Sequence, residues 1–239
     1  MPVTQLQPAK VRDLHTDRIL RHHSLLDSGI TESHVRTARH GYLANVSYFD
    51  HMLGDLLDTL RQTGLSRNTV ILLTADHGDM LGEHGLWFKK HFFDHASRVP
   101  LIVHAPEYFS NGRSLVNVSL VDLLPTLCDL AGFKVAEHTP QTLDGSSLVS
   151  QCEHPDHSNS GAVYAEITSE GVPAPMFMVR SGQYKLIQGG DVPPVLYDLA
   201  NDPEAHSNVA DEPELTDTRR SLESLDRKST RLNSSHTSI

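Results

Sequence analysis

Residues 69–79 read TVILLTADHGD, and this stretch decides the expected fold. It begins with an apolar run rich in β-branched residues and ends in the polar segment 76–79. A short apolar run bounded by turn residues is typical of a strand that is buried on both faces of a sheet. We therefore predict a buried strand over residues 69–75, with a polar turn at its carboxyl end.

The chain before this strand carries the pattern of one long amphipathic helix. Its apolar residues recur at steps of three and four: Val35, Ala38, Tyr42, Val46, Phe49, Leu53, Leu56, Leu57 and Leu60. Thr31 is a suitable N-cap, and Gly64 is a suitable C-terminal stop. A long helix followed by a buried strand is half of a parallel α/β unit.

Beyond the strand, the sequence predicts a second strand over residues 99–104 and a helix over residues 120–130 that is capped by Ser119. Residues 176–179 and 184–187, separated by a turn near Ser181 and Gly182, then predict an antiparallel hairpin, with a third strand over residues 195–199. The expected fold class is α/β. Part of a mainly parallel sheet, flanked by helices, is followed by a small antiparallel C-terminal subdomain.

This pattern predicts five parts of the chain. They are an irregular approach segment (1–30), the α/β core (31–137), a loop or linker rich in His, Ser, Pro, Gly and Asp (138–160), the antiparallel subdomain (161–225) and a basic, Ser/Thr-rich tail (226–239). The tail loses all periodicity, so it is excluded from the expected fold.

The composition excludes several kinds of partner. The 239 residues include 30 acidic and 20 basic side chains, and a net charge of −10 is unfavourable for binding nucleic acid. No apolar run approaches the roughly 18–20 residues of a membrane span, and the first residues lack the apolar region of a secretory signal. Two cysteines, Cys128 and Cys152, suit a reducing compartment. We therefore expect a cytoplasmic protein without a nucleic-acid or membrane partner.

Asp76 and His77 directly follow the expected strand. Ligands of α/β sheets bind beyond the carboxyl ends of strands, so these side chains are expected to face a site. A carboxylate oxygen and an imidazole nitrogen are common metal ligands, and Gly78 allows the sharp turn that lets both converge. Lys89 lies near enough in sequence to return to this site and face an anionic substrate. The alternatives are solvated loop residues for the Asp-His pair and a surface residue for the lysine.

The 16 histidines raise the question of a second metal centre. His91 and His95 have the spacing of a zinc pair on a helix, but the zinc-protease motif needs a glutamate where this chain has Phe92. Ordinary loop packing is therefore preferred for these two histidines.

Longer stretches resemble the C-terminal half of the sulfatase family, within the alkaline-phosphatase-like superfamily. The similarity runs in order through TADHGDMLGEHGLWFKK from residue 74, RVPLIVHAP from residue 98, VSLVDLLPTLCDLAG from residue 118, MVRSGQYKLI from residue 178 and LYDLANDPEAHSNVA from residue 196. The combination of LGEHGLWFK, VSLVDLLPTL and RSGQYKLI is most similar to the choline-sulfatases.

The resemblance implies metal-dependent hydrolysis of a small-molecule sulfate monoester, with choline-O-sulfate as the expected substrate. Asp76 and His77 match the family's later pair of ligands for a divalent cation, with Ca²⁺ favoured and Mg²⁺ or Mn²⁺ as alternatives. Lys89 matches the catalytic lysine that contacts the sulfate and the departing oxygen. Glu166 matches, by spacing, a headgroup-binding carboxylate, with an exposed loop carboxylate as the alternative. A homo-oligomer of the full-length enzyme is compatible with the resemblance.

The family's nucleophile is not encoded in this chain. It is a formylglycine made from Cys or Ser in a C/S-x-P-x-R motif, and neither Cys128, Cys152 nor any serine has that context. The family's N-terminal aspartate ligands are also absent. We therefore expect a C-terminal part of the enzyme that is inactive alone, with the nucleophile upstream. The open alternatives are another sulfatase, a phosphonate or phosphodiester hydrolase of the superfamily, or an inactive sulfatase-like fragment.

Overall fold

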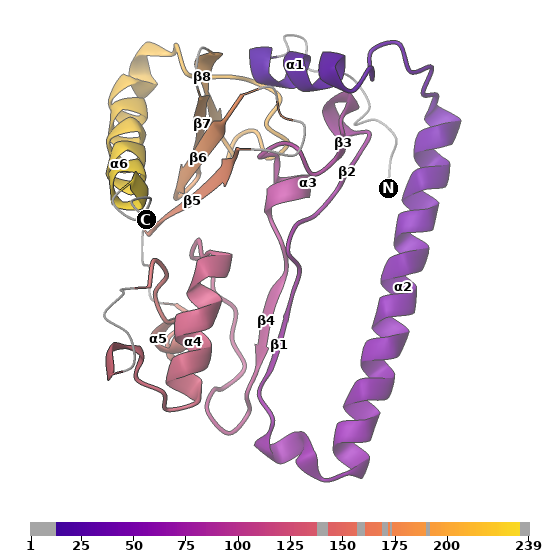
Figure 1. Cartoon of the computed structure of the whole chain (residues 1–239), viewed down its shortest axis with the longest axis vertical. Coiled ribbons are helices and arrows are strands. Elements are labelled where there is room, and N and C mark those ends of the chain that lie inside the picture. The colour runs from indigo at the N-terminus through magenta and orange to yellow at the C-terminus, as the bar shows by residue number, and fades with distance from the viewer. Residues whose placement is uncertain are drawn as a thin grey trace. The chain divides into compact units, whose positions relative to one another are not determined.

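The structure is a computed structural model that describes residues 13–137, 143–156, 161–168, 172, 174–189 and 192–234, without the side chains of Ala136 and residues 226–234. The chain divides into two compact units, which are described one at a time (Figure 1). The first consists of Met1–Glu107 and Ile167–Ala174, and the second of Tyr108–Glu166 and Pro175–Ile239.

The first unit contains a helix where an irregular approach segment was expected. Helix α1 spans Leu14–His22 and is capped by Asp13, whose carboxylate accepts a hydrogen bond from the Thr16 backbone N–H at 2.8 Å. Its buried residues are His15, Thr16, Ile19 and Leu20. The prediction was wrong because a helix of two to three turns offers too short a pattern, and burial of one face decides its stability.

Helix α2 (Glu32–Gln62) confirms the predicted long helix. The Thr31 hydroxyl accepts a hydrogen bond from the His34 backbone N–H at 3.4 Å, and the His34 ring accepts one from the Thr31 N–H at 3.2 Å. The helix ends just before Gly64, whose φ of 74° is the left-handed conformation expected of a stop. Both predicted ends of this helix are therefore confirmed.

A 3₁₀ turn, η2 (Leu65–Asn68), connects α2 to strand β1 (Ile71–Thr74), which pairs with β4 (Leu101–His104). The two predicted strands exist, but they run antiparallel, so the expected mainly parallel sheet is not confirmed in the described part of the chain. The prediction that β1 is buried on both faces is wrong, because all four of its residues are only half-buried. A two-stranded ribbon leaves part of each face uncovered.

A short hairpin follows β1. Strand β2 (Met80–Leu81) pairs antiparallel with β3 (Trp87–Phe88), and the 3₁₀ turn η3 (Glu83–Gly85) lies between them. A single helical turn, α3 (Asp94–Ser97), comes after the hairpin. The hairpin returns the chain toward the turn that ends β1.

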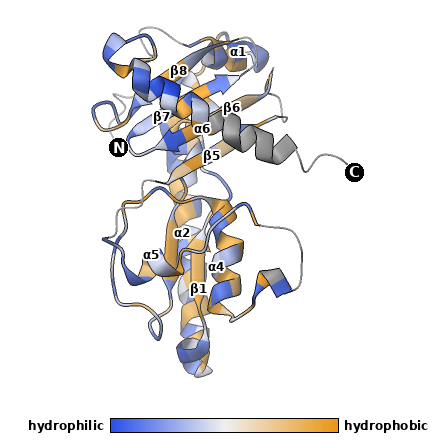
Figure 2. Cartoon of the chain, turned by 90° about the vertical axis from the view of Figure 1, so that its left-hand side faces the viewer, coloured by the Kyte–Doolittle hydropathy of each residue, from blue (hydrophilic) through white to orange (hydrophobic). Residues whose placement is uncertain are grey.

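The second unit begins with the predicted helix. The 3₁₀ turn η4 (Leu120–Asp122) continues into α4 (Leu123–Leu130). Ser119 is the N-cap, as predicted, and the Asp122 carboxylate completes a capping box by accepting a hydrogen bond from the Ser119 backbone N–H at 2.8 Å. Figure 2 shows that α4 is largely hydrophobic, and two of its leucines, Leu124 and Leu127, are exposed. A turn, η5 (Val135–Glu137), and a short helix, α5 (Val149–Glu153), follow.

The second unit also contains a four-stranded sheet in the order β5 (Ala162–Ile167), β6 (Met176–Ser181), β7 (Tyr184–Gly189) and β8 (Val192–Asp198). Strands β6, β7 and β8 pair antiparallel, which confirms the predicted hairpin and third strand. The expected small antiparallel sheet is therefore present.

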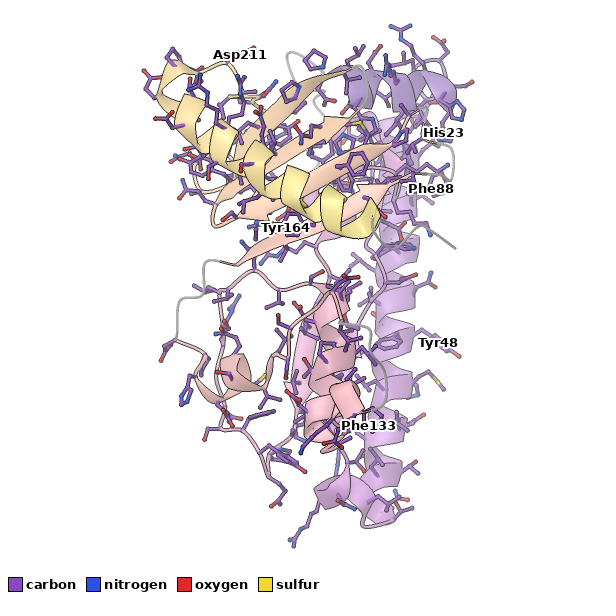
Figure 3. The ribbon with its side chains drawn as sticks, turned by 60° about the vertical axis from the view of Figure 1, so that its left-hand side comes forward. His23, Tyr48, Phe88, Phe133, Tyr164 and Asp211 are labelled. Atoms are coloured by element: carbon purple, nitrogen blue, oxygen red, sulfur yellow. The ribbon has the colours of Figure 1, made fainter. Side chains whose placement is uncertain are left out.

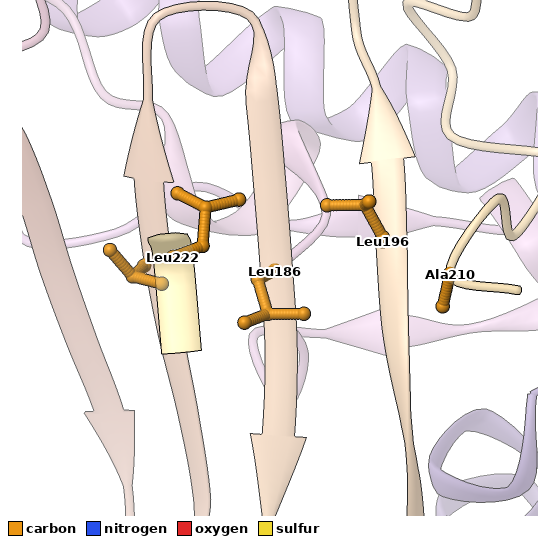
Figure 4. Close-up of a cluster of buried hydrophobic side chains, with 5 residues drawn as sticks. Leu186, Leu196, Ala210 and Leu222 are labelled. Carbon is orange, nitrogen blue, oxygen red and sulfur yellow. The ribbon is translucent and has the colours of Figure 1, made fainter. Parts of the chain in front are cut away.

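Helix α6 (Thr216–Ser234), preceded by the turn η6 (Pro213–Leu215), packs on β6 and β7. Together they enclose a core of Val179, Leu186, Leu196, Ala210 and Leu222 (Figure 4). The helix runs on through residues 226–234, part of the tail that was excluded from the expected fold, whereas residues 235–239 lie outside the described residues. No helix in the described ranges has the length and apolar character needed to cross a bilayer.

Candidate functional site

The turn after β1 brings together the two predicted metal ligands. Asp76 Oδ1 accepts a hydrogen bond from the His77 backbone N–H at 2.9 Å, and Asp76 Oδ2 lies 3.5 Å from His77 Nε2. His77 Nδ1 lies 2.8 Å from the Gly78 carbonyl oxygen, which can only accept. Nδ1 therefore carries the proton of the neutral ring, and Nε2 keeps its lone pair. The turn presents a carboxylate oxygen and an imidazole nitrogen side by side.

Gly78 fixes this turn against α3. Its backbone N–H donates to the Ala96 carbonyl oxygen at 2.8 Å. A Cβ atom at position 78 would lie 2.1 Å from the His95 carbonyl oxygen, so no residue other than glycine fits without backbone movement. The sequence predicted a glycine here for the sharp turn, but Gly78 is not among the residues with positive φ, and the reason for glycine is the close approach of the His95 backbone.

Lys89 directly follows β3 and is exposed. In the hairpin, Met80 lies opposite Phe88, so Lys89 follows the residue that pairs with Met80. Phe88 has a φ of 67°, an uncommon conformation for a bulky side chain, and it is exposed next to Lys89 (Figure 3). The hairpin thus brings the residue before Lys89 beside Met80, which is four residues after Asp76 in sequence.

A buried ion pair holds this hairpin to α2, and the sequence analysis missed it. Arg39 Nη2 lies 2.5 Å from Glu83 Oε1, and both residues are less than a tenth exposed. Arg39 Nε also donates to the Leu81 carbonyl oxygen at 3.2 Å, while Glu83 Oε2 accepts from the Leu81 N–H at 2.6 Å. The sequence feature that indicates a buried partner is the position of Arg39, four residues after Val35 on the apolar side of the helix.

A stack of aromatic rings is formed by residues on both sides of Lys89 in sequence. His84 and His91 each stack on Phe93, with ring centroids 3.8 Å and 4.0 Å away. His91 Nε2 lies 3.1 Å from Thr16 Oγ1, and that hydroxyl donates to Asp13 at 2.5 Å, so the imidazole is the donor to Thr16. His91 is therefore part of the packing of α1, as expected from the preference for loop packing over a zinc pair.

His15 is buried beside this stack, with its ring centroid 5.0 Å from that of His91. The pKa of His15 is lowered to about 4, and burial is the main cause. The neighbouring Asp13 carboxylate opposes this shift, and the positive charge of Arg18 adds to it. His15 is therefore a neutral imidazole at physiological pH.

Glu166 lies on β5 in the second unit, and its side chain is exposed. Tyr164, also exposed, precedes it by two positions and so shares its face of the strand (Figure 3). An anionic carboxylate and an aromatic ring on one face are the two groups that favour a quaternary ammonium ion.

The two cysteines are free thiols on helices of the second unit, Cys128 on α4 and Cys152 on α5. Burial raises the pKa of the Cys152 thiol, and the neighbouring Glu153 carboxylate raises it further. A raised thiol pKa disfavours the reactive thiolate. The environment of Cys152 agrees with the absence of a nucleophile motif around it.

Comparison with known families identifies the chain. The profile of the sulfatase family matches residues 10–133, and that of the C-terminal part of N-sulphoglucosamine sulphohydrolase matches residues 82–231. The chain belongs to the sulfatase family. The resemblance stated from the sequence is thereby confirmed.

Individual relatives agree with this assignment. A choline-sulfatase from Rhizobium meliloti (strain 1021) is 39% identical over 206 residues, which cover 86% of this chain and 40% of that protein. The solved structure of a 2-O GAG sulfatase is similar with a TM-score of 0.73 and 28% identity, over 94% of this chain and 50% of that one. The phosphonate monoester hydrolase of Agrobacterium radiobacter gives a TM-score of 0.71 and 27% identity, over 87% of this chain and 44% of that one. The sulfatase chain described here thus spans half or less of the length of these relatives.

Proposed function

We propose that this chain supplies Asp76, His77 and Lys89 to a metal-dependent sulfatase that hydrolyses choline-O-sulfate to choline and sulfate. The observation that carries the proposal is the turn after β1, where Asp76 Oδ2 and His77 Nε2 lie 3.5 Å apart with their lone pairs available. The 39% identity to a choline-sulfatase supports the choice of substrate.

The Asp76-His77 pair fits a divalent cation. The hydrogen bond from His77 Nδ1 to the Gly78 carbonyl fixes the tautomer in which Nε2 can bind a metal, as outer-shell partners of metal-binding histidines commonly do. The carboxylate favours a hard cation such as Ca²⁺, Mg²⁺ or Mn²⁺. Within the described ranges no three His, Cys, Asp or Glu side chains gather in a metal-binding group, so we propose that the enzyme's other ligands lie outside that part. When bound, the cation polarises the sulfate oxygens and neutralises their charge.

Lys89 directly follows Phe88, the hairpin residue that pairs with Met80. We propose that it binds a sulfate oxygen and stabilises the negative charge that develops on the departing ester oxygen. The overall reaction breaks the S–O bond to the alcohol, adds one water and releases the alcohol and sulfate. The nucleophile, a formylglycine in this family, is proposed to lie outside this chain.

Glu166 and Tyr164 are proposed to bind the trimethylammonium headgroup. The carboxylate offers a counter-charge, and the aromatic face offers a cation–π contact worth about 0.5–2 kcal/mol. Both groups are exposed on one face of β5, so a ligand can reach them.

The test uses a chimera in which this chain replaces the matched 206 residues of the Rhizobium meliloti choline-sulfatase. We expect hydrolysis of choline-O-sulfate that chelation abolishes and a divalent cation restores. Glu166→Gln should lower kcat/KM for choline-O-sulfate about tenfold and leave 4-nitrophenyl sulfate, which has no ammonium group, within twofold. Equal losses on both substrates would contradict the headgroup role, and activity that survives chelation would contradict the metal.

A second candidate is hydrolysis of phosphonate monoesters, which is favoured by the similarity to the Agrobacterium radiobacter enzyme. The same chimera separates the two functions, because kcat/KM for choline-O-sulfate should exceed that for a phenyl phosphonate monoester. The reverse order would favour the second candidate.

The chain alone is proposed to be inactive, because neither Cys128 nor Cys152 stands in a nucleophile motif. Sulfate release by the purified 239-residue chain, at a rate lowered by Lys89→Ala, would contradict this proposal. The two free thiols also favour a reducing compartment, and we propose a cytoplasmic location on that ground.

A further inference from the structure

Phe88 has a backbone conformation that neither its residue type nor its packing explains (Figure 3). Its φ of 67° lies in the left-handed region, where a bulky side chain is an outlier. Its ring is 64% exposed, so burial of the ring does not offset the strain. His84, with a φ of 53°, is different, because its ring is buried and stacks on Phe93. A strained residue directly before Lys89 indicates a function for the backbone conformation itself.

The chain is fixed on the N-terminal side of Phe88. Met80, its partner across the hairpin, is 1% exposed, and so is Leu86, two residues before it. The Gly82 backbone N–H donates to the Leu86 carbonyl oxygen at 3.0 Å, and the Leu86 N–H donates to the Glu83 carbonyl oxygen at 2.8 Å. The hairpin therefore holds the chain in one place up to position 88.

The chain is fixed again directly after Lys90. His91, Phe92 and Phe93 are each at most 3% exposed. The Ser97 hydroxyl lies 3.0 Å and 3.1 Å from the carbonyl oxygens of Phe92 and Phe93. Residues 89 and 90 are thus a short link between two buried segments.

The conformation of Phe88 sets the direction in which this link leaves the hairpin. Residues of a strand have negative φ, so the positive φ of Phe88 turns the chain out of β3 just before Lys89. We propose that Phe88 is a positioning residue, whose left-handed backbone directs Lys89 toward the sulfate ester. This inference rests on the proposed catalytic role of Lys89 and adds the residue that positions it.

The test compares variants at position 88 in the chimera described above. Phe88→Gly and Phe88→Asn remove the ring but tolerate the left-handed conformation, so kcat for choline-O-sulfate should stay within about threefold of the unmodified chimera. Phe88→Val introduces a β-branched residue, which disfavours that conformation strongly, and should lower kcat by about tenfold or more. Phe88→Thr, also β-branched, replaces it should Phe88→Val not fold.

A second substrate separates mispositioning of Lys89 from a loss of folded enzyme. In 4-nitrophenyl sulfate the departing oxygen is stabilised by the aromatic ring, so it depends less on the lysine than the departing oxygen of choline does. Phe88→Val should therefore lower kcat for this substrate by less than about threefold. A loss of folded enzyme lowers both kcat values by the same factor, and that result would overturn the proposal.

The double variant Phe88→Val with Lys89→Ala shows whether Phe88 acts through Lys89. Once the lysine is removed, Phe88→Val should change kcat by less than about twofold. Losses that multiply in the double variant would overturn the proposal. A loss of about tenfold in Phe88→Gly would also overturn it, because the ring would then be the functional group.

The same variants distinguish failure of this inference from failure of the proposed function. A large loss with Lys89→Ala and none with Phe88→Val would overturn the positioning role alone. Full activity of Lys89→Ala would contradict the catalytic role of the lysine, and the positioning role would fall with it.

Discussion

Removing Arg39 should destabilise the chain far more than removing an exposed arginine of the same helix. Arg39→Ala deletes the 2.5 Å ion pair and the hydrogen bond to the Leu81 carbonyl, and it leaves the Glu83 carboxylate 7% exposed without its counter-charge. An uncompensated buried charge of this kind costs about 3–5 kcal/mol. The matched control is Arg36, which lies three residues before Arg39 and pairs with Glu32 in solvent. Arg36→Ala should lower the free energy of unfolding by less than about 0.5 kcal/mol.

Urea unfolding followed by the fluorescence of Trp87, the single tryptophan, measures both free energies. Trp87 lies on β3 opposite Leu81, so its signal reports the hairpin that the ion pair holds. The double variant Arg39→Met with Glu83→Met should recover most of the loss, because two apolar side chains leave no unpaired charge. The reasoning fails if Arg39→Ala costs no more than Arg36→Ala, or if the double variant is as unstable as Arg39→Ala.

Three further predictions concern stability. Gly78→Ala should lower the free energy of unfolding by about 1–3 kcal/mol, since the new Cβ would lie 2.1 Å from a backbone carbonyl of α3; an unchanged urea midpoint would contradict this. The pKa of His15 is about 4 in the folded chain and near 6.5 in the unfolded chain. Between pH 4 and pH 6.5 the unfolded chain therefore binds more protons than the folded chain. Stability should be intact above pH 6.5 and fall by about 3 kcal/mol toward pH 4, and His15→Leu should abolish that part of the pH dependence. Leu196→Ala in the core of the second unit should cost about 2–5 kcal/mol, whereas Leu115→Ala, at an 87% exposed position, should stay within about 0.5 kcal/mol of wild type when urea unfolding is followed by circular dichroism.

Local patterns in the sequence predicted the elements that depend on local physics. Helix α2 was predictable because its stripe is long and both ends carry clear signals, Thr31 and Gly64. The turn of Asp76 and His77 was predictable because it follows an apolar strand directly. The direction and the burial of β1 were not predictable from the sequence. Both depend on which other strands lie beside it, and hydrophobic periodicity carries no such information.

Long-range contacts explain the parts of the site that the sequence analysis missed. Arg39 and Glu83 are 44 residues apart, and nothing in either local pattern pairs them. The packing of His91 against Thr16 likewise joins residues 75 positions apart. The register that pairs Phe88, the residue before Lys89, with Met80 depends on a hairpin of two-residue strands, which is too short to give a periodic signal.

The most direct test of the central claim is sulfate release by the chimera described above, compared between two adjacent lysines. Lys89→Ala should lower kcat for choline-O-sulfate by about 10²–10³, the usual loss for removing a group that stabilises developing charge. Lys90, whose Nζ lies 3.1 Å from His23 Nε2, is the matched control, and Lys90→Ala should stay within about threefold of the unmodified chimera. Equal effects of the two substitutions, or full activity of Lys89→Ala, would contradict the assignment of this chain to the working site of a sulfatase.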